Sequence, residues 1–178
     1  SKYHAKVEKD HTPEAYAKFD FLYKDDLMRF ATLTAEVTTM QIFKRPEEDR
    51  QYILAADVAR GDEKDYSTIQ VLDVKTLEQV AEYRDKVGPD LFPFVINAVG
   101  NMYNMAYVVI EANSFGLGVC FDIRDKFKYK RNRLYFSKNI KDIHVRHHNY
   151  KVNEGTEIPG FQTSRKNRVL LVKAIIEH

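Results

Sequence analysis

The sequence predicts a mixed α/β domain, and three features of its apolar pattern support this prediction. The stretch "YILAA" at 52–56 is apolar on both faces, as in a central strand that is covered on two sides. Two further strand-like runs follow at 67–74 and 77–84, separated by a short polar turn. An amphipathic run and a second fully apolar strand at 106–111 come next, which is typical of a strand–helix–strand unit.

The first three strands are expected to form an antiparallel meander, because only short connections separate them. "VGPD" at 87–90 then breaks the chain, and Asp90 is a candidate N-cap for a helix. One apolar stripe marks that helix, formed by Leu91, Phe92, Val95, Ile96, Val99, Met102 and Tyr103. Since the strand at 106–111 is reached through this helix, a right-handed crossover should place it parallel to strand one.

The C-terminal part of the sequence continues the alternation of helices and strands. Residues 113–127 predict a second helix with Ser114 as a candidate cap, and "RLYF" at 133–136 predicts a short fifth strand. Residues 137–163 are rich in basic and turn residues, which indicates a long loop or hairpin, and 164–178 predicts a last helix. The expected order is therefore βββαβαβα, with helices on both faces of the sheet.

Residues 1–48 are polar and are expected to form a helical arm or linker. Thr12 before Pro13 is a good helix start. Apolar residues then recur at helical spacing, namely Phe19, Leu22, Tyr23, Leu27, Phe30 and Leu33. "KRPEED" at 44–49 marks the boundary, so the expected domain covers 49–178. Because the chain begins at Ser1 and stops within a helical pattern, we expect a fragment of a longer protein.

The composition narrows the class of protein. A length of 178 residues with 44% hydrophobic residues suits one folded domain and argues against disorder. The apolar runs are far shorter than the roughly 20 residues that span a bilayer, so no membrane association is expected. The single cysteine, Cys120, cannot form an internal disulfide and is expected to be a small core residue.

Positive charge gathers in one stretch although the net charge is only +2. Residues 124–151 contain ten basic residues against two acidic ones. This stretch is either a binding surface for a polyanion or a solvated face without a partner, and charge alone leaves both open. The candidate DNA-binding residues within it are Lys126, Lys128, Lys130, Arg131, Arg133, Lys138, Lys141 and Arg146.

Two acidic residues end the two fully apolar strands. Asp57 follows strand one and Glu111 follows strand four, so adjacent parallel strands would bring both carboxylates to one sheet edge. Such a pair repels itself unless a cation neutralises it, and carboxylates suit Mg²⁺ or Mn²⁺. Two such ions could catalyse hydrolysis of a phosphodiester bond, one by activating water and the other by stabilising the leaving oxygen. Asp65 could point back as a further ligand. The alternative for each acid is a turn or helix-cap role.

Two segments together resemble the nuclease domain of the large terminase subunit of tailed bacteriophages, most closely its T4-like branch. They are "PEEDRQYILAADVARGDEKDYSTIQVLDV" and "YNMAYVVIEANSFGLGV", and the resemblance runs from Lys44 to His178. It implies an RNase H-like fold with antiparallel strands one to three followed by parallel strands four and five. It also implies that Asp57 bridges two catalytic metal ions, that Glu111 binds one of them and that Asp65 supports the site.

The resemblance further implies a metal-dependent endonuclease that cuts concatemeric double-stranded viral DNA during genome packaging, in the host cytoplasm. Implied partners are the N-terminal ATPase motor of the full-length chain, the small terminase subunit and the portal. The family's third catalytic aspartate has no match here, so the domain is expected to be truncated at its C-terminus. Two alternatives stay open: a catalytically incomplete DNA-binding or assembly module, and another RNase H-like nuclease such as a junction resolvase.

Overall fold

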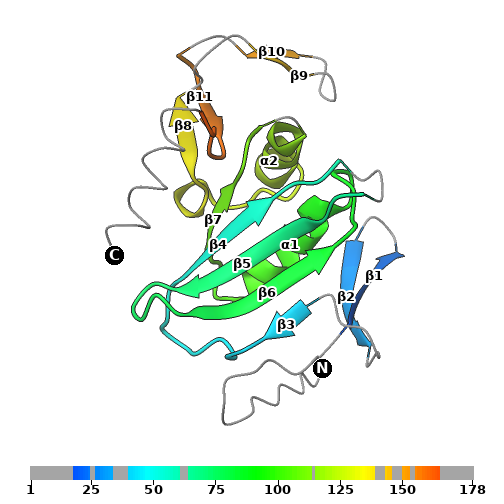
Figure 1. Ribbon diagram of the computed structural model, residues 1–178, viewed down its shortest axis with the longest axis vertical. Coiled ribbons are helices and arrows are strands. Elements are labelled where there is room, and N and C mark those ends of the chain that lie inside the picture. Colours follow the sequence, from blue (N-terminus) through cyan, green and yellow to red (C-terminus); the bar gives the residue numbers. More distant parts are fainter. Residues whose placement is uncertain are drawn as a thin grey trace.

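The computed structural model is built around a five-stranded mixed sheet (Figure 1). The structure describes residues 18–24, 27–33, 40–60, 64–113, 115–138, 143–145, 150–152 and 155–164. The strands of the sheet are β3 (Met40–Ile42), β4 (Tyr52–Asp57), β5 (Ser67–Asp73), β6 (Gln79–Asp85) and β7 (Tyr107–Ile110). Their order across the sheet is β3-β6-β5-β4-β7.

The strand directions confirm the predicted mixed α/β class. β4, β5 and β6 form the antiparallel meander, and β7 pairs parallel with β4. Side chains alternate along each strand, so residues such as Leu54, Ile69 and Val108 are buried on one face. Their neighbours on the other face are only half-buried. We call this second face the open face.

Two helices supply the other half of the core. α1 (Phe92–Met102) lies behind the sheet in Figure 1, and α2 (Gly116–Asp125) packs against it. The predicted N-cap at Asp90 is wrong, because α1 begins after Leu91 without a side-chain cap. The predicted core role of Cys120 in α2 is confirmed. In the described part of the chain, neither helix has the length and apolar character needed to cross a membrane.

The expected helical arm is wrong where the structure describes it. β1 (Lys18–Lys24) and β2 (Leu27–Leu33) form an antiparallel hairpin instead. Aromatic residues at 19, 21 and 23 also fit the period of two of a strand, so the helical spacing was not the only pattern present. Moreover, β3 joins the sheet through β6, so the sheet includes residues before the expected boundary at 48.

The fifth strand differs from its prediction as well. Arg131–Arg133 form a 3₁₀ turn, and Leu134 makes a single parallel bridge to Val108. The chain then leaves the sheet, because the next strand, β8 (Phe136–Lys138), pairs with β11 (Glu157–Pro159). β9 (Ile143–Val145) and β10 (Tyr150–Val152) form another hairpin. The last helix expected at 164–178 lies outside the described residues after Ser164.

A buried serine ties together two loops at the edge where β4 and β6 end. Ser67 is fully buried at the start of β5. Its hydroxyl accepts a hydrogen bond from the backbone N–H of Ala59 at 3.0 Å and donates one to the carbonyl of Val87 at 2.9 Å. The loop after Asp57 is thereby fixed to the segment after β6.

We predict that Ser67→Ala lowers the free energy of unfolding by about 1–3 kcal/mol, because it leaves a buried N–H and a partly buried carbonyl without partners. Urea unfolding followed by circular dichroism measures this change. Thr156→Ala, which removes an exposed hydroxyl, is the control and should stay within about 0.5 kcal/mol of the unmodified protein. Equal effects of the two substitutions would show that the hydrogen bonds of Ser67 do not stabilise the fold.

Candidate active site

Two acidic residues meet where β4 and β7 end. Ala56 pairs with Ile110 in the parallel register, and the backbone N–H of Glu111 donates to the carbonyl of Ala56 at 2.9 Å. Asp57 and Glu111 are the next residues along the two strands. The structure thus brings these two predicted site residues together at the carboxyl ends of neighbouring parallel strands, where ligands bind in open α/β sheets.

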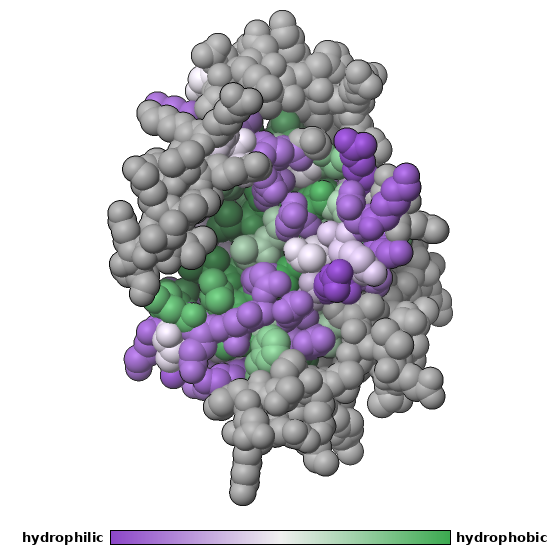
Figure 2. All heavy atoms as spheres, viewed as in Figure 1, coloured by the Kyte–Doolittle hydropathy of each residue, from purple (hydrophilic) through white to green (hydrophobic). Residues whose placement is uncertain are grey.

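Both acidic side chains lie on the open face. Ala56 and Ile110 are buried on the helix side, so the residues that follow them point the opposite way. Figure 2 views this face, with hydrophobic side chains over β4 and β7 and mainly hydrophilic ones over β5 and β6. The carboxylates therefore emerge at the end of an apolar strip.

Proximity changes the electrostatics of Asp57. The pKa of the Asp57 carboxyl is raised by partial burial, by a hydrogen bond with Glu111 and by repulsion from the Glu111 charge. A hydrogen bond from the backbone N–H of Val58 lowers this pKa by a smaller amount. A divalent cation would relieve this repulsion, and carboxylate oxygens are the donors that Mg²⁺ and Mn²⁺ prefer. The pair therefore fits a metal site in both geometry and donor chemistry.

Asn113 orients Glu111. Its side-chain amide donates to Glu111 Oε1 at 2.9 Å and to the backbone carbonyl of Thr163 at 3.3 Å. The second contact links the site to the segment after β11. Asn113 belongs to the Glu-Ala-Asn tripeptide of the sequence, but only the structure shows which oxygen of Glu111 it contacts.

Close packing at the start of α2 requires a glycine. A Cβ atom placed on Gly116 would lie 1.8 Å from the carbonyl oxygen of Glu111. The N–H of Gly116 donates to the carbonyl of Asn113 at 2.9 Å, which makes the turn from β7 into α2 tight. On the other side, Phe161 continues the sheet through a parallel bridge to Glu111. The glutamate is therefore held from two directions.

The third predicted acid does not join the pair. Asp65 is exposed in the loop before β5. Within the part of the chain that the structure describes, no group of three metal-binding side chains occurs. A supporting role for Asp65 stays a prediction.

The structure spreads the predicted DNA-binding residues over several places. Lys126 lies over the rings of Phe94 and Phe127, at 4.5 and 5.9 Å from their centres, on the side of the sheet that the helices cover. Lys128 and Lys130 flank the buried Tyr129, whose hydroxyl donates to the carbonyl of Ala106, just before β7 begins. Both lysines are themselves exposed.

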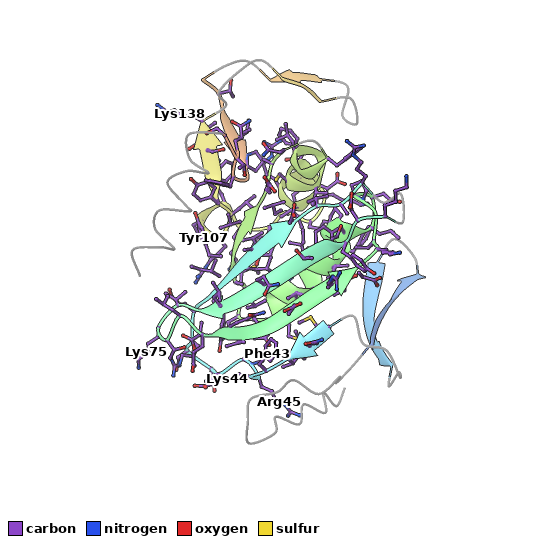
Figure 3. The ribbon with its side chains drawn as sticks, viewed as in Figure 1. Phe43, Lys44, Arg45, Lys75, Tyr107 and Lys138 are labelled. Carbon is purple, nitrogen blue, oxygen red and sulfur yellow. The ribbon has the colours of Figure 1, made fainter. Side chains whose placement is uncertain are left out.

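The remaining predicted cations are nearer to β8. Arg131 pairs with Glu157 and stacks on Phe136, and Arg133 is half-buried in the 3₁₀ turn. Lys138 is exposed at the end of β8, as labelled in Figure 3. Lys141 and Arg146 lie outside the described residues. DNA binding by this set stays a prediction, and the structure does not gather its described members around Asp57.

Comparison with known proteins identifies similar solved structures. The large terminase nuclease from thermophilic phage G20c with bound magnesium is 22% identical, with a TM-score of 0.47 over 53% of this chain and 49% of that one. The large terminase nuclease domain of Thermus phage P74-26 is 22% identical, with a TM-score of 0.44 over 53% of this chain and 47% of that one. This chain therefore covers about half the length of the solved chains that it matches. The G20c nuclease has also been solved with zinc and with cobalt. No protein-family model matches the sequence.

We predict that Asp57→Asn raises the melting temperature of the metal-free protein at neutral pH. The raised pKa of Asp57 means that its ionisation opposes folding. The stability that protonated Asp57 contributes is fully present below its ordinary pKa of 3.8. This stability is lost as the pH rises through the raised pKa of the folded state. The advantage of the variant should therefore grow with pH and vanish in strong acid.

Differential scanning fluorimetry in EDTA across this pH range measures the effect. Adding Mn²⁺ should stabilise the unmodified protein and leave Asp57→Asn unchanged. Glu48→Gln, which neutralises an exposed acid before β4, is the matched control and should behave like the unmodified protein. A lower melting temperature of Asp57→Asn at neutral pH would show that Asp57 is a structural turn residue.

A second prediction concerns the glycine at the start of α2. Gly116→Ala should destabilise the protein by more than about 2 kcal/mol, because the overlap involves backbone and cannot be relieved by a side-chain rotation. Urea unfolding measures the loss. A change below about 0.5 kcal/mol would mean that the connection between β7 and α2 adjusts freely.

Proposed function

We propose that this protein is a metal-dependent endonuclease that hydrolyses phosphodiester bonds of duplex DNA. The observation that carries the proposal is the pair of carboxylates at the ends of the parallel strands β4 and β7, with the pKa of Asp57 raised by its neighbour. Mg²⁺ or Mn²⁺ is the proposed cofactor. When bound, two such ions supply an activated water and stabilise the leaving oxygen.

The residues have distinct proposed roles. Asp57 would hold both ions, and Glu111 would hold one of them. Asn113 holds Glu111 by the hydrogen bond to Oε1, which leaves its other oxygen available for a metal ion. Water, the substrate phosphate, or a carboxylate beyond the described residues would complete the metal site.

The proposed biological role is cutting concatemeric viral DNA during packaging, in the cytoplasm of the infected host. It is based on the motif resemblance of the sequence, from the aspartate that ends β4 to the Glu-Ala-Asn tripeptide. The ATPase motor of a longer chain, the small terminase subunit and the portal are the corresponding proposed partners.

One observation favours a second candidate function. The described residues gather two carboxylates and not three. A site with too few ligands would suit a DNA-binding or assembly module that does not cut. Binding of DNA that is equal with and without metal, together with absent cleavage, would identify this module.

We predict metal-dependent nicking of supercoiled plasmid by the protein. Mn²⁺ or Mg²⁺ should convert plasmid to nicked and linear forms, and EDTA should prevent this conversion. Asp57→Asn should reduce the rate at least about 100-fold, because it removes the carboxylate proposed to bridge both ions. Gel electrophoresis over time measures the rate. Equal nicking by Asp57→Asn would disprove the assigned metal site.

We also predict that Asn113→Ala lowers the single-turnover cleavage rate by about 10–100-fold, as is usual when a residue that orients a metal ligand is removed. The loss should be smaller at high Mn²⁺ concentration, because the ligand remains and only its orientation changes. Asn101→Ala, on an exposed part of α1, is the control. A loss that is equal at all metal concentrations would contradict the positioning role.

A further inference from the structure

Three side chains gather where β5 begins and β6 ends, on the open face two strands away from Asp57. Tyr66 is 40% exposed immediately before β5. The Arg84 guanidinium lies 3.9 Å from the centre of its ring, and the Lys86 amine lies 5.5 Å from it. We call these residues the Tyr66 cluster. None belongs to the basic stretch that the sequence singled out.

Strand register places Arg84 in one row with the acidic pair. Asp57 is opposite Thr68 in β5, and Thr68 is opposite Arg84 in β6. Directly paired residues point to the same face of a sheet, so Arg84 shares the open face with Asp57. Neighbouring strands are about 4.8 Å apart, so the two backbone positions are separated by about 10 Å.

The cluster is preorganised for an anion. Both cations are exposed, and within the described residues no carboxylate lies at ion-pair distance from Arg84 or Lys86. Stacking on Tyr66 restrains the guanidinium plane and leaves its N–H groups at the edge free to bind. A planar, restrained guanidinium matches a phosphate through two parallel hydrogen bonds.

Two of the cations in the basic stretch are engaged differently. Lys126 lies over aromatic rings of the helix layer, and Arg131 is paired with Glu157. Both are on other parts of the molecule, whereas Arg84 is in the same register row as Asp57.

We propose that the Tyr66 cluster binds a backbone phosphate of the DNA substrate within about three nucleotides of the cleaved bond, given the rise of 3.4 Å per nucleotide. This inference relies on the proposed nuclease function and adds the direction in which the DNA strand lies. The strand runs across β4, β5 and β6 along the row of Asp57, Thr68 and Arg84. Arg84 is a positioning residue, since it contacts a phosphate that does not react.

Binding of a labelled 30-base-pair duplex in EDTA, at several salt concentrations, tests the proposal. Arg84→Ala should weaken binding about tenfold at low salt and reduce the slope of log affinity against log salt by about one. The double substitution with Lys86→Ala should reduce the slope by about two. Arg84→Lys should keep the slope and lose part of the affinity, because it retains charge without the planar fork.

The control is Lys75→Ala. Lys75 is exposed in the turn at the opposite end of the same β5–β6 hairpin, as Figure 3 shows. Lys75→Ala removes an equal charge from the same hairpin, but far from the Tyr66 cluster. It should therefore change the affinity by less than about twofold and the slope by no more than a few tenths. Tyr66→Phe should also match the unmodified protein, because the stacking ring remains.

The outcomes separate the two proposals. If Arg84→Ala behaves like Lys75→Ala in binding, the phosphate contact is wrong, even when the unmodified protein cleaves DNA with Mn²⁺. If the unmodified protein does not cleave but Arg84→Ala still loses affinity and slope, the phosphate contact holds and the nuclease function is wrong.

Discussion

The parallel pairing of β4 with β7 is the constraint on which the site depends. Ala56 and Ile110 are in register, and the hydrogen bond from Glu111 to the carbonyl of Ala56 continues that register by one residue. Because side chains alternate along a strand, a shift of one residue would bury a carboxylate among the side chains of the core. The apolar residues that fix the register thereby also fix the distance between the two acids.

Several contacts hold this arrangement against the repulsion between the carboxylates. Asn113 braces Glu111, and Gly116 allows α2 to begin against its backbone. Gly160 has φ +94° and brings the segment after β11 onto β7, where a Cβ atom would meet the Cys120 sulfur at 2.5 Å. The acidic pair is therefore fixed from the strand ends, the helix start and the neighbouring segment, which preorganises it for a cation.

The open face of the sheet carries charges of both signs. The open face carries the acidic pair and, two strands away, the Tyr66 cluster. On the helix side, the Lys126 ammonium group lies over aromatic rings. Alternating negative and positive sites along one row suit a metal ion and a neighbouring phosphate. In the proposed function, this arrangement lets a chain with a net charge of only +2 bind a polyanion locally.

The sequence by itself determined the meander, the helix after it, the parallel return strand and the two acids at the strand ends. Local apolar periodicity encodes those elements, and a helical crossover leaves one usual handedness for the return. Only the tertiary structure decided that the segment at 18–33 forms a hairpin, that residues 136–138 pair with β11, and that Arg84 stands in line with Asp57. Residues 18–33 satisfy both the helical and the strand period, so the local pattern cannot select between them. The position of Arg84 follows from the pairing register of β5 and β6, which is shifted by an irregularity between Val71 and Leu72 that local periodicity does not specify.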